Sequence, residues 1–543
     1  MTDPSPAIRR NGLLQSCEPC RKSKLKCDHG RPVCGRCSAK NITQRCFYHP
    51  APMTRQDADS SRPPGKRPRT GSPNTSSPQP PSTAQSSLRN PERPSTTPGY
   101  LGSTSFSAVL SDNRTDIAFE EGNCTTHGVF ASLTDHFRLD SGLEVLKFLY
   151  RNTICDVLLR RFYAGHIIAA VSGLIIEATL QSIRRVFGSL DRGKDLETQL
   201  RDLVATIFRA SAHPLTAHSA MTVDEYFASF TDGNLRWEAV GVMLATTGIA
   251  MMSTSDSDPD FVKVAPDPQA RDMLVTQVVE ASGICLGFCD SAASVNELLG
   301  FFRYNDMLLR TQYYGDTSYT AWRKLGSLTA TIYAAGLHQE HARGQGTYPP
   351  FLQQWRKTCF AAAFYADKCL STFVGRPPFI NYRYCSVSAP LDLSDEDLIA
   401  GGGRLEQAMG RLDAAGWDTN GGNLRTSMNR LRFLLAVLRE QALEIALGTF
   451  DEGNILQKYN KLISSAQTLW ESCPPKLRHD LSVRTDGFKS TLAFARHHIY
   501  LEYLYTLFLV QRMVVKRTST GHEALFYTSR EASVLGCMFV PFP

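Results

Sequence analysis

The sequence predicts a small cysteine-rich module, a disordered linker and a large all-α region, in that order. Six of the fifteen cysteines lie between residues 17 and 46, and residues 51–98 have almost no large apolar side chain. Beyond residue 100, apolar residues recur at helical spacing with almost no strand-like alternation. We therefore expect three parts, at residues 1–50, 51–99 and 100–543.

The cysteines of the first part have the spacing of metal ligands, Cys17-x2-Cys20-x6-Cys27-x6-Cys34-x2-Cys37-x8-Cys46. A C-x2-C pair lets two thiolates reach one zinc ion from a single tight turn, and a third cysteine adds a third ligand. Each half is therefore one ligand short of a tetrahedral site. Six thiolates satisfy two tetrahedral zinc ions only if two sulfurs bridge both metals.

A disulfide knot or a different zinc module is the alternative for these six cysteines. No secretory signal precedes them and no histidine lies at a finger-like spacing, so metal binding is favoured over disulfides. A peptide of this size has little hydrophobic core. We expect zinc to supply its folding free energy, on the order of 10 kcal/mol per site, and the module to be unfolded without metal.

Positive charge is concentrated at the N-terminus. The net charge is +7, but the first 100 residues carry 17 Lys and Arg against 6 Asp and Glu, whereas the rest carry 42 against 46. A polyanion is the natural partner for such a segment, and nucleic acid is the commonest one.

The cysteine segment resembles the fungal zinc-cluster transcription factors, which carry a binuclear Zn2Cys6 knot. The basic run from Arg21 to Lys26 and Pro32, two places before the fourth cysteine, agree with that family, and the last spacing of eight is at the long end of its range. The resemblance implies two Zn²⁺ per chain bridged by Cys17 and Cys34. It also implies that the chain binds double-stranded DNA in the nucleus.

A short helix is predicted from Pro19 to Lys26, with its charged residues facing outward. A lysine in the major groove can donate to guanine O6 and N7. The resemblance places this role on Lys24 and implies a CGG half-site. The remaining basic residues are predicted phosphate contacts, with a merely solvated basic face as the alternative; they are Arg21, Lys22, Lys26, Arg31, Arg36 and Lys40. We expect binding to depend strongly on salt.

Residues 51–99 are rich in Pro, Ser, Thr, Arg and Gln and cannot bury enough surface to fold. Prolines also break any coiled-coil heptad directly after the cysteines, so either a monomer or a homodimer is compatible with the sequence. The basic run Lys66, Arg67 and Arg69 fits a nuclear-import signal, and it fits equally a tether that adds phosphate affinity.

The third part contains many apolar stripes of helical period. One stripe runs from Leu143 to Phe162, and further helices are predicted at 167–187, 196–210, 236–252, 271–289, 295–312, 319–338, 352–374, 424–448, 455–470 and 488–515. The glycines at 401–403 and 421–422 are expected to bound a mobile loop. The apolar runs 239–252 and 499–515 are respectively too short and interrupted for membrane spans, so buried helices and no membrane partner are expected.

We expect this part not to be an enzyme, because it has no nucleophile elbow, P-loop or dinucleotide glycine motif. Two histidine pairs, His338/His341 and His497/His498, are interpreted as surface or core residues rather than metal ligands. The acidic residues Asp392, Asp395, Glu396 and Asp397 are interpreted as a helix N-terminal turn.

The family resemblance extends into this part through Gly315-Asp316, Trp322, Gly336-Leu337-His338 and Gly375-Arg376-Pro377. These segments resemble the middle homology domain of the same family, a helical regulatory unit that sometimes senses small metabolites. The resemblance implies an RNA polymerase II transcription factor for metabolic genes, with a biosynthetic cluster as one target and a small-molecule effector as one partner. The absence of an acidic tail before Pro543 makes a repressor or competitor one alternative, and an all-α enzyme with a zinc appendage is another.

Overall fold

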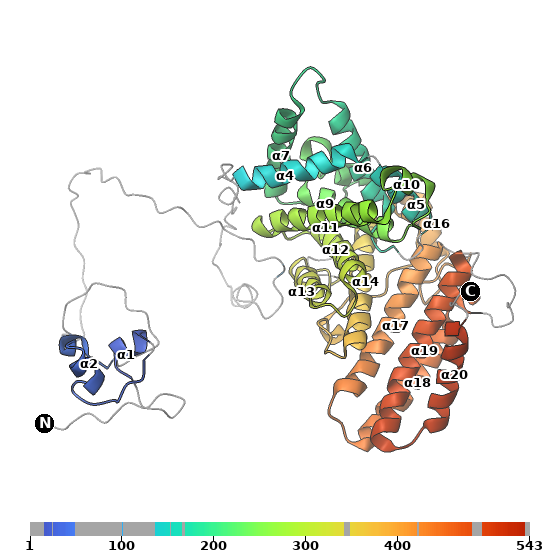
Figure 1. Ribbon diagram of the computed structural model, residues 1–543. Coiled ribbons are helices and arrows are strands. Elements are labelled where there is room, and N and C mark those ends of the chain that lie inside the picture. The colour runs from blue at the N-terminus through green and yellow to red at the C-terminus, as the bar shows by residue number, and fades with distance from the viewer. Residues whose placement is uncertain are drawn as a thin grey trace, which may run out of the picture. The chain divides into compact units, whose positions relative to one another are not determined.

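The computed structural model describes residues 16–23, 25–48, 100, 136–152, 154–165, 169–340, 348–420, 423–479 and 491–537. The chain divides into two compact units, Met1–Leu88 and Arg89–Pro543 (Figure 1). Both units contain helices, which dominate the second, and no β-strand occurs in the ranges just given, which confirms the predicted fold class. The linker, the run from Lys66 to Arg69, and residues 421–422 lie outside the described residues.

The described residues of the first unit form two short helices and a turn, α1 (Glu18–Lys22), α2 (Gly35–Ala39) and η1 (Thr43–Arg45). The backbone N–H of Glu18 donates to the carbonyl of Phe47 at 2.9 Å, which ties the two ends of the module together. The helix predicted at 19–26 is wrong beyond Lys22. Leu25 N–H donates to the Cys20 carbonyl at 3.0 Å, a six-residue turn that ends the helix and turns the chain back.

The second unit is built from helices of very different lengths. They are α4 (His136–Arg151), α5 (Ile154–Gly165), α6 (Gly173–Gly188), α7 (Leu196–Ala212), α8 (Val223–Ala228), α9 (Trp237–Met252), α10 (Pro259–Val264), α11 (Pro268–Ser291), α12 (Glu297–Tyr314), α13 (Tyr319–Ala334), α14 (Pro350–Val374), α15 (Asp395–Ala400), α16 (Gly402–Gly410), α17 (Leu424–Leu447), α18 (Glu452–Ser472), α19 (Thr491–Thr518) and α20 (His522–Cys537). Short 3-10 turns, η2 (Asp232–Asn234), η3 (Tyr382–Tyr384) and η4 (Pro475–Leu477), lie between them.

Helix α9 is the centre of the larger hydrophobic core. All of its residues except Met252 are buried, because α5, α6, α7, α11 and α12 pack around it. Two glycines let α12 approach closely: a Cβ on Gly241 would lie 2.2 Å from the Phe302 ring, and one on Gly248 would lie 2.7 Å from Leu309. The two glycines are seven residues apart on α9, and Phe302 and Leu309 are seven residues apart on α12. One face of each helix therefore forms the contact.

The C-terminal helices form a bundle, and α14 connects this bundle to the larger hydrophobic core around α9. Helix α17 packs against α14, α18 and α19, and α20 packs against α19 (Figure 1). Leu431 and Leu435 from α17, Ile499 and Leu504 from α19 and Leu535 from α20 share one apolar cluster. The sequence analysis did not predict α20.

Two further expectations are corrected by the structure. The stripe from Leu143 to Phe162 is two helices, α4 and α5. Asn152, directly after α4, adds a side-chain N–H bond of 2.8 Å to the Phe148 carbonyl beside its backbone bond of 3.1 Å. The loop expected after Gly401 contains α16, and Arg411 holds it through ion pairs with Asp397 (3.1 Å) and Asp418 (3.2 Å).

One helix in the described part of the chain, α11, is long and apolar enough to cross a membrane. The sequence analysis did not single it out. More than half of its apolar window, 56%, is buried in the unit, where α11 packs against α9, α4 and α12. Its apolar character is therefore explained by core packing. The run at 239–252 lies in the buried helix α9, as predicted.

Candidate metal centre and nucleic-acid interface

The six cysteines of the first unit come together in space. Two groups of four Sγ atoms, in each of which all atoms lie within 4.8 Å of one another, share two sulfurs; the groups are Cys17, Cys20, Cys27, Cys34 and Cys17, Cys34, Cys37, Cys46. All six are free thiols, so the disulfide alternative receives no support.

The distances between these sulfurs fit tetrahedral zinc. The Sγ–Sγ distances are 3.5 Å for Cys17–Cys34, 3.7 Å for Cys17–Cys37, 3.8 Å for Cys20–Cys34 and 3.9 Å for Cys17–Cys27. Four sulfurs bound at about 2.3 Å to one tetrahedral zinc ion lie roughly 3.8 Å apart. Each group can therefore hold one zinc ion, with Cys17 and Cys34 facing both.

Backbone N–H groups donate hydrogen bonds to two of the cysteine sulfurs. The Cys37 N–H donates to Cys34 Sγ at 3.4 Å from the first turn of α2, and the Cys34 N–H donates to Cys46 Sγ at 3.3 Å. Such hydrogen bonds orient thiolate ligands and stabilise their negative charge.

Burial and hydrogen bonds shift the acidity of several thiols of the cluster in opposite directions. Burial raises the pKa of Cys17 and Cys20 above the ordinary thiol value. The pKa of Cys34 is instead lowered to about 6, because the effect of burial is outweighed by the Cys37 N–H and the neighbouring thiols. Zinc binds cysteine as the thiolate, so metal binding and loss of the thiol protons are linked.

Two residues that the sequence analysis missed brace the cluster. Asp28 Oδ2 accepts the Gly35 N–H at 2.8 Å at the start of α2, and this bond lowers the pKa of Asp28. The Tyr48 hydroxyl donates to the Gly30 carbonyl at 2.9 Å and lies 3.8 Å from Cys27 Sγ. Neither interaction follows a spacing rule that a sequence could reveal.

Several of the predicted DNA contacts are exposed around the cluster. The exposed basic residues among them are Lys22, Lys26, Arg31, Arg36 and Lys40. Arg36 donates to the Lys26 carbonyl at 3.3 Å, and the Arg31 guanidinium lies 4.8 Å from the centre of the Tyr48 ring. Lys24 and the Arg21 side chain lie outside the described residues. The structure thus brings five basic side chains and the cysteine cluster into one small module.

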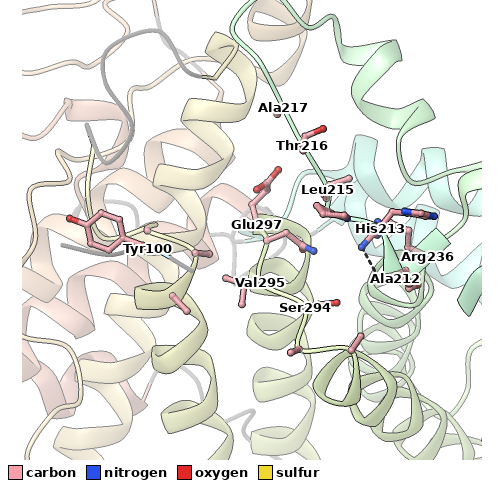
Figure 2. A pocket seen from close by; sticks show the side chains of 18 of the residues that line it. Tyr100, Ala212, His213, Leu215, Thr216, Ala217, Arg236, Ser294, Val295 and Glu297 are labelled. Atoms are coloured by element: carbon pink, nitrogen blue, oxygen red, sulfur yellow. Dashed lines mark hydrogen bonds between the residues drawn. The ribbon is translucent and has the colours of Figure 1, made fainter. Parts of the chain in front are cut away.

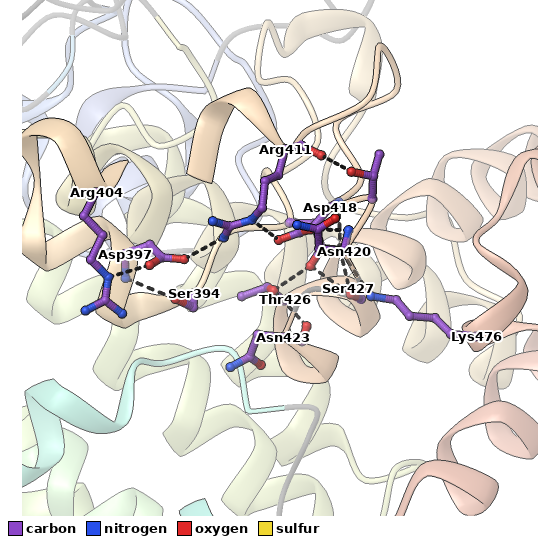
Figure 3. A network of polar contacts seen from close by, with 12 residues as sticks. Ser394, Asp397, Arg404, Arg411, Asp418, Asn420, Asn423, Thr426, Ser427 and Lys476 are labelled. Atoms are coloured by element: carbon purple, nitrogen blue, oxygen red, sulfur yellow. Dashed lines mark hydrogen bonds and ion pairs between the residues drawn. The ribbon is translucent and has the colours of Figure 1, made fainter. Parts of the chain in front are cut away.

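Three of the four acidic residues predicted to form a helix N-terminal turn, Asp392, Asp395 and Asp397, accept hydrogen bonds or form ion pairs with protein groups, whereas Glu396 is exposed; Figure 3 shows part of this network. Asp392, which is fully buried, accepts from Ser427 Oγ (2.8 Å) and Thr426 Oγ1 (2.7 Å), and Asp397 pairs with Arg404 (2.8 Å). Ser394 caps α15 by accepting the Asp397 N–H. The interpretation as a helix N-terminal turn therefore fits residues 395–397, whereas Asp392 fixes the start of α17.

Within the ranges that the structure describes, no histidine belongs to a group of His, Cys, Asp and Glu side chains close enough to hold a metal ion. His497 contacts His479 (3.2 Å) and the Leu535 carbonyl (3.0 Å) through its two ring nitrogens. His338 is buried between the rings of Tyr100 and Tyr333. His341 lies outside the described residues. These contacts are those of core histidines.

A polar cavity of about 360 Å³ lies among α7, α12 and α13 (Figure 2). Its Arg236 pairs with Glu238 at 3.0 Å and donates to the carbonyls of Ala210 (2.9 Å) and His213 (2.7 Å). Arg356 pairs with Glu297 at 3.4 Å. Both cations in this cavity therefore have protein partners, and no catalytic constellation is assembled there.

One further buried charge pair holds residues 379–380, which follow the Gly375-Arg376-Pro377 segment, against α14. Lys368 and Asp367, both fully buried, pair at 2.8 Å; Asp367 accepts the N–H groups of Phe379 (2.9 Å) and Ile380 (3.0 Å). Lys368 also donates to the Ile380 carbonyl. The chain that follows α14 is thus folded back onto it by charge-assisted hydrogen bonds.

Two family profiles match the chain. The profile of the "Fungal Zn(2)-Cys(6) binuclear cluster domain" matches residues 15–55, and that of the "Fungal specific transcription factor domain" matches residues 307–401. The first covers all six cysteines, and a domain of this family binds two zinc ions. The second is narrower than the predicted region 100–543, whose boundaries stay a prediction.

Curated relatives agree with these profiles over parts of the chain. The "Sorbicillinoid biosynthetic cluster transcription factor sor3" of Hypocrea jecorina is 30% identical over 162 residues, 27% of this chain and 23% of that protein. The "Transcription factor pgmR" of Aspergillus terreus is 41% identical over 70 residues, 12% and 37% of the two chains. The "Oleate-activated transcription factor 1" of Saccharomyces cerevisiae is 44% identical over 59 residues, 10% and 5%.

The alignments thus span well under half of each of these relatives. No solved structure matches the chain significantly.

Proposed function

Because the chain belongs to the fungal zinc-cluster transcription factors, we propose that it is a sequence-specific regulator of RNA polymerase II genes that binds CGG-type sites in the nucleus. The observation that carries the proposal is the pair of four-sulfur groups sharing Cys17 and Cys34, surrounded by exposed basic side chains. A fixed cluster turns a short basic peptide into a rigid surface that can be positioned on a duplex.

All six cysteines act as the ligands in this proposal, and the thiolates of Cys17 and Cys34 bridge the two ions. This assignment is supported by the sulfur distances of 3.5 to 3.9 Å and by the amide donors to Cys34 and Cys46. Loss of one bridging sulfur leaves both groups with three ligands, whereas loss of Cys20 leaves the second group intact.

Lys24 supplies the base contact in this proposal, and the surrounding basic residues bind phosphates. Its position follows α1, whose outer side carries exposed Lys22. A base contact and a phosphate contact have different signatures: the first sets which base pair is preferred, and the second adds affinity for all sequences and steepens the salt dependence. These signatures allow each residue's role to be tested separately.

The run Lys66, Arg67 and Arg69 is proposed as the nuclear-import signal, and metabolic genes are proposed as targets. The proposal of metabolic targets is supported by the similarity to sor3, a sorbicillinoid biosynthetic cluster transcription factor. A repressor or competitor remains the second candidate, and no catalytic role is proposed. Reporter expression after deletion separates the first two, because loss of target expression indicates an activator and gain indicates a repressor.

The test is DNA binding by the purified chain, measured by fluorescence anisotropy on duplexes with CGG or a single base change. We expect Lys24→Ala to lose about 1–3 kcal/mol of binding free energy on the CGG duplex. The variant should then bind the duplex with the changed base nearly as tightly as the CGG duplex. Lys22→Ala is the matched control. It should weaken both duplexes equally and reduce the salt slope by about 1. Equal discrimination by the wild type and Lys24→Ala would remove Lys24 from base recognition.

A further inference from the structure

A second cavity, of about 400 Å³, lies in the helical unit where α5, α9, α12, α14 and α17 meet. Its wall is mainly apolar and aromatic, with buried Tyr304, Met307 and Leu370 and the partly buried ring of Tyr365. The volume lies in the range of about 300–1,000 Å³ that is typical of small-molecule sites. No family profile or relative assigns a role to it.

One cation in this wall lacks the carboxylate partner that such a site normally requires. Arg432 of α17 stacks on Tyr365, with its guanidinium carbon 4.1 Å from the ring centre, and its Nε is buried with no hydrogen-bond partner. Among the described residues, no Asp or Glu oxygen lies within ion-pair distance of it. A guanidinium without a counterion is costly in an apolar wall.

Arg439, seven residues further along α17, also lines this cavity, and its guanidinium has an ion-pair partner and hydrogen-bond acceptors. It pairs with Glu502 at 2.9 Å and donates to Thr506 Oγ1 at 3.1 and 3.0 Å. The carboxylate of Glu502 therefore neutralises Arg439 and forms no ion pair with Arg432. Arg432 shares a side-chain hydrogen bond with Tyr365, whose hydroxyl is neutral, so its charge has no anionic partner among the described residues and is open to a ligand.

We propose that this cavity binds an organic monoanion, with a flat apolar or aromatic body against Tyr304, Met307 and Tyr365 and one carboxylate or sulfonate on Arg432. A guanidinium presents its donors in a planar fork that matches such a group. Only one anionic group fits, because Arg439 is already paired and the exposed Asp316 at the edge of the cavity repels a second. The proposal concerns the helical unit alone, and its test uses no DNA, so it succeeds or fails independently of DNA binding.

The probe is anilinonaphthalene sulfonate, an aromatic monoanion whose fluorescence rises in apolar sites, added to the full-length chain. N-phenylnaphthylamine has the same rings without the sulfonate. We expect one saturable site per chain for each probe. Arg432→Leu should weaken the sulfonate at least about tenfold and leave the neutral probe within about twofold, because only the charge-assisted contact is lost. The affinity of Arg432→Lys for the sulfonate should lie between those of the wild type and Arg432→Leu.

Arg383→Leu is the matched control, since its side chain is 73% exposed and lies outside the lining of this cavity. It should leave both probes unchanged. Leu308→Trp fills the cavity, leaves the charge of Arg432 unchanged and should abolish binding of both probes. If Arg432→Leu alters the circular dichroism spectrum or the melting temperature, Leu308→Trp becomes the deciding test of whether the probes bind in this cavity. Sulfonate binding that is unaffected by Leu308→Trp, equal in wild type and Arg432→Leu, or absent from the wild type would overturn the proposal.

Discussion

Replacing glycine by alanine is expected to have opposite effects at two helical positions of the large unit. At Gly241 in α9, a Cβ would lie 2.2 Å from the ring of Phe302, which is fully buried and cannot move aside without shifting α12. At Gly287 in α11, a Cβ would meet nothing within 4 Å. The two substitutions change helix propensity equally, so any difference between them reports the contact between α9 and α12.

The magnitudes follow from two competing effects. Alanine favours a helix interior over glycine by about 1 kcal/mol, which should make Gly287→Ala slightly stabilising. Forcing a methyl group into a well-packed core costs about 1–3 kcal/mol, and a 2.2 Å approach places Gly241→Ala at the upper end. We expect it to lower the free energy of unfolding by about 2 kcal/mol after the propensity gain.

Urea denaturation followed by circular dichroism measures both variants against the wild type. The wild type should unfold at a midpoint between the two variants, with Gly241→Ala below it and Gly287→Ala at or above it. Gly241→Val extends the series and should be less stable still. If Gly241→Ala is as stable as Gly287→Ala, the close packing of α12 on α9 is wrong and the reasoning fails.

The remaining predictions concern two buried ion pairs. Lys368→Met leaves the Asp367 carboxylate buried with only two backbone donors, so we expect a loss of about 3–5 kcal/mol in urea denaturation, and the double variant Asp367→Asn/Lys368→Met should recover part of it. A double variant less stable than Lys368→Met would contradict this pairing. The pKa of Glu238 is lowered, because the opposing effect of burial is outweighed by the charge and hydrogen bonds of Arg236. Its stabilisation is therefore present above the unfolded pKa of about 4.3 and is lost as pH falls through the lower folded pKa. Glu238→Gln should be less stable than wild type by about 3 kcal/mol at pH 7, with a gap that narrows below about pH 4; a gap that is constant with pH would show that Glu238 is not the titrating group.

The cysteine cluster could be predicted from sequence because its ligands are close in the chain. Each C-x2-C pair fixes two sulfurs within one turn, and the count of six sulfurs for eight metal contacts requires two shared ones. The structure places Cys17 and Cys34 in both groups. The length of the following helix was not predictable, because it depends on the turn from Cys20 to Leu25 that brings Cys27 back.

The helical class and most helix positions followed from apolar periodicity, which records burial directly. Interactions across long separations left no such signal. Arg432 and Arg439 lie seven residues apart on α17, but among the described residues only Arg439 pairs with a carboxylate, that of Glu502 on α19. The clamp of Arg411 on Asp397 and Asp418 likewise converts a glycine-rich segment into an ordered one. Polar partners of this kind require the fold.

The central claim is that two zinc ions held by six cysteines give the first unit its fold and its affinity for DNA. Native mass spectrometry of the full-length chain, with and without chelation, tests it when combined with anisotropy on a CGG duplex. We expect two zinc ions per chain, fewer in both Cys17→Ser and Cys34→Ser than in Cys20→Ser, and loss of DNA binding in step with metal loss. A chain that holds one zinc ion or none and still binds the duplex after exhaustive chelation would contradict the account.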